Sequence, residues 1–249
     1  MIITGGGSGI GRAIALLFAG QGGEVHILDF DEAGAANTTI EIKENNGSAY
    51  AVTCDVSNQQ QVNDIITNIT GNSKAIDILV NNAGVAHIGN AETTSEEDFS
   101  RLFNVNVKGV YNLLHAVIPV MKEKGGVILN MASVASSVGI PDRFAYSMTK
   151  GAVVGMTLST AKDYINYKIR CNCISPARVH TPFVDGFITK TYPGKEKEMF
   201  EKLSKTQPIG RMAQPDEIAS LALYLCSDEA SFITGCDYPI DGGFIKLNN

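Results

Sequence analysis

The sequence predicts an α/β fold in which helices cover both faces of a doubly wound parallel sheet, giving three α/β/α layers. Three observations lead to this prediction. Strand-like and helical patterns alternate along the chain, which is typical of βαβ units. The strand-like runs are almost continuously apolar, as expected when both faces of a sheet are buried. No linker-like or low-complexity stretch interrupts the chain, so residues 1–249 are expected to form one domain.

The element boundaries follow from apolar periodicity and from glycine and proline positions. Strands are expected at residues 1–4, 24–29, 49–56, 76–84, 126–133 and 169–178, and within 233–243. Helices are expected at residues 11–22, 35–47, 60–72, 95–126, 143–165 and 215–228. Residues 183–212 are charged and contain Pro193 and Gly194, so this segment is expected to form a mobile lid over a site. The first strand is short, which suggests that the natural chain begins a few residues before Met1.

Charge and composition argue against several classes of function. The formal net charge is −6 and no basic stripe is present, so neither nucleic acid nor an anionic membrane is an expected partner. No apolar run approaches the roughly 20 residues of a membrane-spanning helix, and no secretory signal is visible. The five cysteines are expected to be buried, reduced thiols, which favours a cytoplasmic location. Cys171 and Cys173 would point to opposite faces of a strand, so no metal site is predicted.

A glycine-rich loop, TGGGSGIG, joins the first strand to the first helix at residues 4–11. Glycine permits a tight turn and a close approach of the backbone to a pyrophosphate, and the helix N-terminus beyond it offers free N–H groups. Asp29 ends the second strand, where a carboxylate can accept hydrogen bonds from both hydroxyls of an adenosine ribose. The same carboxylate would repel a 2′-phosphate, so the prediction is a site for NAD (NADH) rather than NADP. Asp31 is the better candidate for capping the second helix.

These motifs resemble those of the short-chain dehydrogenase/reductase family, in its single-domain form of roughly 250 residues, over essentially the whole chain. TGGGSGIG is similar to the family's T-G-x-x-x-G-I-G loop, CDV at 54–56 to its adenine segment, and NNAG at 81–84 to its strand-end motif. Ser8 stands where NADP-dependent members often carry a basic residue, which again favours NAD. The resemblance implies a Rossmann-like fold and a cofactor site formed by Gly5, Ser8, Gly9, Ile10, Gly11, Asp29, Asp55, Val56, Asn81, Asn82, Ala83, Gly84, Tyr146, Lys150, Pro176, Val179 and Thr181.

The same resemblance assigns four catalytic positions: Asn106 in NVNVKG, Ser133 in LNMAS, and Tyr146 and Lys150 in YSMTK. A free tyrosine has a pKa of about 10, too high for a good base near neutral pH, and a nearby ammonium would lower it. Lys150 lies one helical turn after Tyr146 on the same face, so it can supply that charge. Each residue alone could be structural, but their order and spacing together favour catalysis. The resemblance further implies that Lys150 binds the nicotinamide ribose, Ser133 holds the substrate oxygen and Asn106 anchors a relay water.

Four basic residues are candidates for substrate binding: His87, Arg143, Arg178 and His180. An arginine would bind a carboxylate in fork geometry, so they suggest a small polar substrate such as a hydroxy acid, a sugar acid or a sugar. The alternative is that they are solvated or form salt bridges between elements. Ala177 stands where the family usually has glycine, and because alanine disfavours positive φ, the turn after the sixth strand is expected to differ.

We therefore expect an NAD-dependent enzyme that interconverts a secondary alcohol and a ketone by hydride transfer, with tyrosine as acid and base. The alternatives are a 3-oxoacyl-(acyl carrier protein) reductase, which would usually favour NADPH, and a non-catalytic NAD-sensing protein. The C-terminal stretch TGCDYPIDGGFIKL resembles the family's last strand and its Asp-Gly-Gly turn. Relatives commonly assemble through this end and through paired long helices, so the resemblance implies a homotetramer.

Overall fold

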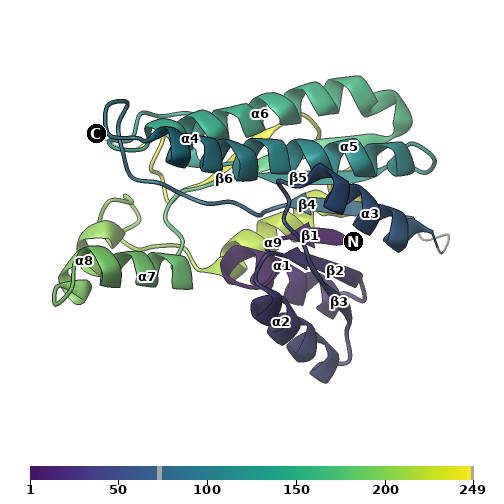
Figure 1. The fold of residues 1–249 in the computed structure, drawn as a ribbon, viewed down its shortest axis with the longest axis horizontal. Coiled ribbons are helices and arrows are strands. Elements are labelled where there is room, and N and C mark those ends of the chain that lie inside the picture. The colour runs from purple at the N-terminus through teal and green to yellow at the C-terminus, as the bar shows by residue number, and fades with distance from the viewer. Residues whose placement is uncertain (72–74, 248–249) are drawn as a thin grey trace.

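A computed structural model describes residues 1–71 and 75–247, and within them seven strands form one parallel sheet (Figure 1). The strand order is β3-β2-β1-β4-β5-β6-β7, and every neighbouring pair is parallel. This is the predicted doubly wound sheet. The strands are β1 (Ile2–Thr4), β2 (Glu24–Asp29), β3 (Ser48–Thr53), β4 (Ile78–Asn81), β5 (Gly126–Met131), β6 (Ile169–Pro176) and β7 (Asp237–Ile240).

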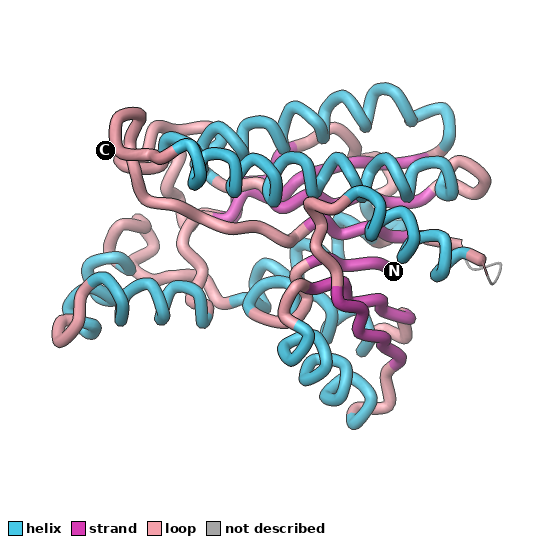
Figure 2. The backbone as a smooth tube through the Cα atoms, in the orientation of Figure 1, coloured by secondary structure: helices cyan, strands magenta, loops and turns pink. Residues whose placement is uncertain are grey.

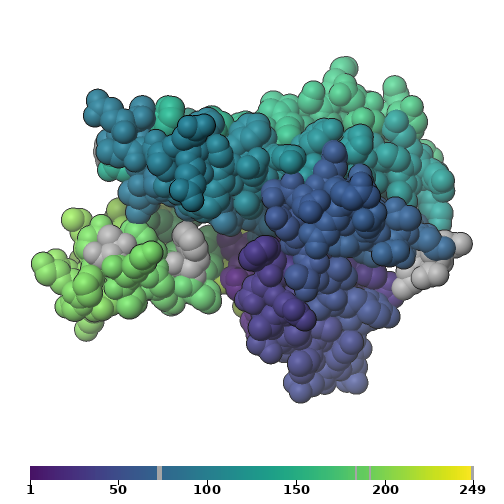
Figure 3. Space-filling view, in the orientation of Figure 1, coloured from purple at the N-terminus to yellow at the C-terminus, as the bar shows by residue number. Residues whose placement is uncertain are grey.

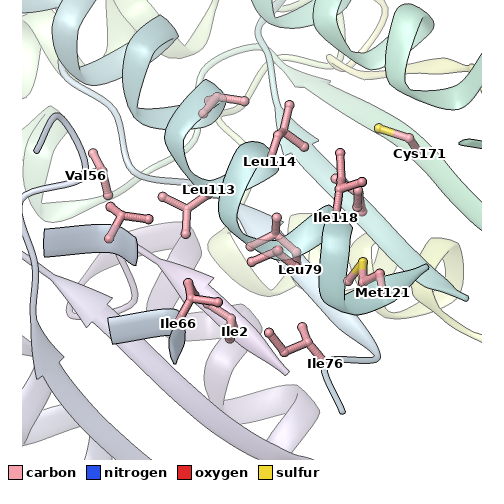
Figure 4. Packing of buried hydrophobic residues seen from close by; sticks show 14 of the residues in the cluster. Ile2, Val56, Ile66, Ile76, Leu79, Leu113, Leu114, Ile118, Met121 and Cys171 are labelled. Atoms are coloured by element: carbon pink, nitrogen blue, oxygen red, sulfur yellow. The ribbon is translucent and has the colours of Figure 1, made fainter. Parts of the chain in front are cut away.

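Helices cover both faces of the sheet, because each face presents a separate apolar cluster. One cluster joins the sheet to α1 (Gly9–Gly20), α2 (Glu32–Glu44) and α9 (Pro215–Cys226). The other joins it to α3 (Gln59–Thr70), α5 (Gly109–Met121) and α6 (Phe144–Tyr164). Figure 4 shows the second cluster, in which Leu79 of β4 lies among Leu113, Ile118 and Met121 of α5. The three predicted layers are confirmed; residue 72, at the predicted end of the third helix, lies outside the described residues.

The long helix predicted at 95–126 is interrupted. It consists of α4 (Glu96–Phe103), a π-helical turn at Asn104–Lys108, and α5, which ends at Met121. Gly109 follows the π turn, and a Cβ there would lie 2.7 Å from Cγ2 of Val56, so glycine lets α5 approach the loop after β3 closely. Single π turns inside α-helices often occur at functional sites, and this one carries Asn106.

The segment 183–212 contains two helices, α7 (Pro182–Thr191) and α8 (Glu196–Ser204), which project beside the sheet in green in Figure 1. Its two ends are held together because His180 N donates to Ala213 O at 2.8 Å and Ala213 N donates to Arg178 O at 2.9 Å. In Figure 2 the longer loops gather on the same side, beyond the carboxyl ends of the strands. The segment is therefore placed beside the edge of the sheet where ligands bind in open α/β folds.

Candidate active site

A cleft of about 870 Å³ opens at the carboxyl ends of the strands. It spans the point between β1 and β4 where the strand order changes direction, the usual ligand crevice of doubly wound sheets. Figure 3 shows the surface recessed between α7–α8, in green, and the N-terminal part of the chain, in purple and blue. Sixteen positions with an expected cofactor role line the cleft: Gly5, Ser8, Gly9, Ile10, Gly11, Asp29, Asp55, Val56, Asn82, Ala83, Gly84, Tyr146, Lys150, Pro176, Val179 and Thr181.

Asn81 is the one expected cofactor residue that does not line the cleft. Its side chain is 3% exposed, and its Nδ2 donates to Oδ1 of Asn130 at 2.8 Å within the sheet. Side chains alternate along a strand, so Asn81 points into the protein where β4 pairs with β5, whereas Asn82 faces the cleft. The Asn81 side chain therefore links two central strands, as expected of the part of this motif that supports the sheet.

The glycine loop leaves an anion-binding cradle at the start of α1. A Cβ on Gly11 would lie 2.0 Å from Gly5 O, so only glycine lets the helix pack this closely on the loop. Gly5 itself has a φ of 67°, a conformation that favours glycine. Ser8 occupies the N-cap position without forming a side-chain capping bond, so its hydroxyl does not engage the N–H groups of the first turn. This arrangement fits a pyrophosphate.

Asp29 is anchored at the end of β2 by two backbone N–H groups. Its Oδ2 accepts from Gly7 N at 2.7 Å, and its Oδ1 accepts from Asp31 N at 3.0 Å. Each carboxylate oxygen keeps a further lone pair that can face a ligand in the cleft. Asp31 is the N-cap residue of α2, as predicted, but its side chain forms no capping hydrogen bond.

The adenosine end of the cleft also contains residues that sequence reasoning missed. Phe30 lines the cleft with 79% of its surface exposed, directly after Asp29. Ser57 donates from its backbone N and its Oγ to Oδ1 of Asp55, at 2.9 and 2.7 Å, and so fixes that carboxylate. An aromatic residue immediately after a strand-end acid is a signal that could have identified Phe30.

Ser133, Tyr146 and Lys150 are brought together at the opposite end of the cleft. Ser133 follows β5, and its Oγ accepts from Ala135 N at 3.2 Å. Tyr146 and Lys150 lie on α6, with Lys150 Nζ 5.8 Å from the centroid of the tyrosine ring. Lys150 is 5% exposed, and its Nζ donates to Met131 O at 2.7 Å. The shared helical face expected of this pair is therefore present.

Burial, a hydrogen bond and nearby positive charge act together on the pKa of Tyr146. Burial raises the pKa of the Tyr146 phenol, while a hydrogen bond with Ser133 and the positive charge of Arg143 lower it. Burial also lowers the pKa of Lys150 from 10.5 to about 8, because the buried ammonium loses its hydration. Arg143 therefore adds a second positive charge that favours the phenolate. The tuning role expected of Lys150, whose Nζ lies 5.8 Å from the centroid of the tyrosine ring, stays a prediction.

Asn106 is 1% exposed and braces the site from behind rather than lining it. Its Oδ1 accepts from Val85 N at 2.8 Å, and its Nδ2 donates to Val85 O at 2.9 Å and to Thr149 Oγ1 at 3.0 Å. Thr149 Oγ1 in turn donates to Tyr146 O at 2.8 Å. Both N–H bonds of the Asn106 amide therefore donate to protein atoms. A relay water beside Asn106 would have to accept its hydrogen bond from another donor. Thr149 was missed in the sequence, although it is one of two hydroxyl residues between Tyr146 and Lys150 in YSMTK.

The four candidate substrate residues separate into two pairs. Arg143 and Arg178 line the cleft, whereas His87 and His180 do not. His87 Nδ1 lies 3.5 Å from Oδ1 of Asp98, and His180 Nε2 lies 2.9 Å from Oδ1 of Asp185. For the two histidines, salt bridging between local elements is therefore the better interpretation.

Ala177 lies in the turn after β6 without a positive φ. Among the described residues other than glycine, only Asn46, Asp142 and Lys168 have positive φ. The conformation at Ala177 is thus one that alanine adopts without strain, and its N donates to Ile240 O of β7 at 3.2 Å. The backbone here does not use the conformation that glycine would permit, and the expected difference from the family's glycine-containing turn stays a prediction.

A family model described as enoyl-(acyl carrier protein) reductase, from the short-chain dehydrogenases/reductases, matches residues 5–245. The chain belongs to the short-chain dehydrogenase/reductase family. It is 38% identical over 245 residues to a 2-keto-3-deoxy-L-fuconate dehydrogenase of Xanthomonas campestris pv. campestris, covering 98% of this chain and 79% of the relative. Enzymes of this family bind a nicotinamide cofactor and act on CH–OH groups, so this chain is an oxidoreductase of alcohol and ketone substrates.

Two solved structures of the family are close to this fold. A 3-ketoacyl-(acyl carrier protein) reductase from Brucella melitensis, complexed with NADH, superposes with a TM-score of 0.88 at 38% identity, covering 98% of this chain and 96% of that one. The L-sorbose reductase of Gluconobacter frateurii, complexed with NADPH and L-sorbose, has a TM-score of 0.93 at 28% identity, covering 99% and 96%. Among the described residues, no helix combines the length and apolar character needed to cross a membrane.

Proposed function

We propose that this short-chain dehydrogenase/reductase uses NAD to interconvert a secondary alcohol and a ketone on a small polar substrate, with Tyr146 as acid and base. The observation that carries this proposal is the convergence of Ser133, Tyr146 and Lys150 in the same cleft as the glycine loop and Asp29. Small polar substrates are supported by the sugar acid and the sugar named for the two relatives from Xanthomonas and Gluconobacter.

When bound in this cleft, a nicotinamide cofactor would supply the hydride chemistry, and the residues of this chain would orient the substrate and move the proton. Tyr146 Oη takes the hydroxyl proton as the alcohol is oxidised and gives it back as the ketone is reduced. Ser133 Oγ holds the substrate oxygen and stabilises the charge that develops on it. Lys150 contributes a cation beside the tyrosine ring and binds the nicotinamide ribose, while Asn106 and Thr149 keep α6 in register with the loop after β4.

The preference for NAD is proposed from the charge at the adenosine end. Asp29 is fixed at the end of β2 by Gly7 N and Asp31 N, where its carboxylate would repel a 2′-phosphate. Ser8 adds no positive charge to the loop. The test is a panel of sugars, sugar acids, hydroxy acids, polyols and steroids followed by NADH absorbance, repeated with NADP. Turnover that is equal or faster with NADP would contradict the preference.

A 3-oxoacyl-(acyl carrier protein) reductase is the second candidate. An expected NADPH preference counted against it, but the related Brucella reductase is complexed with NADH, which weakens that argument. Acetoacetyl thioester reduction in the presence of NADH distinguishes the two. A non-catalytic NAD sensor is disfavoured because the full set of catalytic residue types is present, and NADH binding without turnover of any panel member would favour it.

Assembly and location are proposed from the resemblance and from the thiols. We expect a homotetramer that pairs through the long helices and the C-terminal strand, and light scattering that shows a monomer would refute it. All five cysteines are free, and four of them are buried, which suits a reducing compartment such as the cytoplasm. We propose further that α7 and α8 close over the substrate end of the cleft.

A further inference from the structure

Two guanidinium groups face the same end of the cleft. Arg143 precedes α6 and Arg178 follows β6, and both line the cleft with Tyr146. The positive charge of Arg143 acts on both neighbours, since it lowers the pKa of Tyr146 and, after the larger effect of burial, the pKa of Arg178. Arg143 is therefore electrostatically close to both the reacting phenol and the second arginine.

Neither arginine is neutralised within the part of the chain that the structure describes. Among the described residues, no ion pair joins either guanidinium to a carboxylate. The acids in the described lining of the cleft are Asp29, which ends β2, and Asp55, which follows β3. Both lie on the other side of the point between β1 and β4 where the strand order changes direction. Two like charges held together in a partly buried site are unfavourable unless an anion joins them.

Arg178 is held so that its terminal nitrogens remain free. Its Nε donates to Thr206 Oγ1 at 3.1 Å, and its backbone N donates to Gln207 Oε1 at 3.2 Å. Gln207 Nε2 donates to the same threonine oxygen at 2.6 Å, which fixes the support. Neither Nη of Arg178 has a hydrogen bond to the described protein, and Arg143 uses only Nη1, which donates to Asp142 O at 2.9 Å. The donors needed for a bidentate anion are therefore in place.

We propose that Arg143 and Arg178 jointly bind a carboxylate of the substrate, so that the enzyme acts on short hydroxy acids and the corresponding keto acids. The proposal rests on the proposed alcohol–ketone activity and names the substrate class of that same site. The carboxylate lies within a few carbons of the reacting carbinol, because Arg143 is close to Tyr146. Ile140, Val184 and Phe244 line this end of the cleft and offer apolar contacts to the short carbon chain. A neutral acyl thioester would leave both arginines without an anion.

The experiment compares each acid with its amide. Rates of NAD reduction are measured for short 2- and 3-hydroxy acids and for the corresponding hydroxy amides, with the wild type, Arg178→Gln, Arg143→Gln and Lys205→Gln. Lys205 is exposed, lies beside Thr206 and does not line the cleft, so Lys205→Gln controls for the loss of one positive charge. We expect Arg178→Gln to lower kcat/KM for the acid about 10- to 100-fold and for the amide less than threefold.

A binding measurement separates this proposal from the alcohol–ketone activity. Calorimetry with the protein–NADH complex records binding of butyrate, which cannot react, and of butyramide. Butyrate binding that is lost in Arg178→Gln but kept in Lys205→Gln supports the carboxylate site even if no alcohol is turned over. Turnover of acids and amides at equal rates, or equal losses for both in Arg178→Gln, would overturn the carboxylate site while leaving the alcohol–ketone activity in place.

Discussion

At the end of the cleft formed by β1, β2 and β3, charged side chains are tied to backbone N–H groups. The end that follows β5 and β6 carries two arginines that have no carboxylate partner among residues 1–71 and 75–247. Asp29 and Asp55 each accept from backbone N–H groups nearby in sequence or across the loop. Arg143 and Arg178 come from segments 35 residues apart and are supported by Asp142, Thr206 and Gln207.

This difference separates a site for the cofactor, which many enzymes share, from a site for one class of substrate. The adenosine end is formed by short motifs whose geometry is set by residues close in sequence. These motifs do not contact the substrate, so the same motifs can serve enzymes with different substrates. The substrate end depends on which side chains the fold brings together, and its unpaired positive charge selects the ligand. Changes at one end should therefore alter cofactor choice, and changes at the other end should alter chemistry and substrate.

The largest expected effect is at the reacting phenol. Tyr146→Phe removes the proton donor and acceptor, so kcat should fall about 10²- to 10⁴-fold. Binding of NADH, measured by its fluorescence, should change less than about twofold because the adenosine end is untouched. Tyr164→Phe, on the same helix but outside the cleft lining, is the matched control and should keep full activity. Comparable rates for Tyr146→Phe and the wild type would remove the tyrosine from the mechanism.

The second largest effect is expected at Asp29, at the adenosine end of the cleft, and it concerns the choice of cofactor. Asp29→Asn keeps one acceptor for the backbone N–H groups but loses the negative charge, so the ratio of kcat/KM for NAD to that for NADP should fall about 10- to 100-fold. The chemistry at Tyr146 should persist at saturating cofactor. Asp31→Asn is the control, since that side chain makes no capping bond, and its ratio should match the wild type. An unchanged ratio in Asp29→Asn would exclude a discriminating role for Asp29.

The third prediction concerns stability at the substrate end. The pKa of Lys150 is about 8 in the folded protein, below the 10.5 of an exposed lysine, so between these values the unfolded chain binds more protons. The contribution of Lys150 to the free energy of unfolding should therefore rise by about 1–3 kcal/mol as the pH increases from 8 to 10.5. Lys150→Met should remove this rise and melt at a higher temperature than the wild type at pH 7. Parallel wild-type and Lys150→Met stability curves from pH 7 to 10 would contradict the shift.

The smallest effect is expected at Thr149, which links Asn106 to the backbone of Tyr146 behind the cleft. Thr149→Val leaves one Nδ2 proton of Asn106 without its acceptor and removes the donor to Tyr146 O. We expect kcat to fall about 3- to 10-fold with KM little changed, because the tyrosine is displaced rather than lost. Thr149→Ser keeps the hydroxyl and should restore the rate. If Thr149→Val kept the wild-type rate and Thr149→Ser did not, the volume of the side chain would matter and its hydroxyl would not. Thr149 would then contribute packing and would not orient Tyr146.

The sequence was sufficient to predict most of the fold, since the apolar runs identified the strands and the glycine loop marked the first β–α turn. It placed the expected catalytic residues in order but not their contacts. The π turn at Asn104–Lys108 could not be predicted, because it depends on the fit of Asn106 against Val85 and Thr149, which are distant in sequence. The orientation of Asn81 could not be predicted either, because only the pairing of β4 with β5 shows which face its side chain occupies.

By itself, the sequence determined what depends on local rules: alternating strands and helices, a helix N-terminus preceded by glycines, an acid at the end of β2, and a tyrosine and a lysine on one helical face. The tertiary structure alone decided which charges meet. It paired His87 and His180 with neighbouring aspartates, left Arg143 and Arg178 facing the cleft, and set Arg143 beside Tyr146. The physical reason is that electrostatic energy depends on separation and burial in space, and neither can be read from distance along the chain.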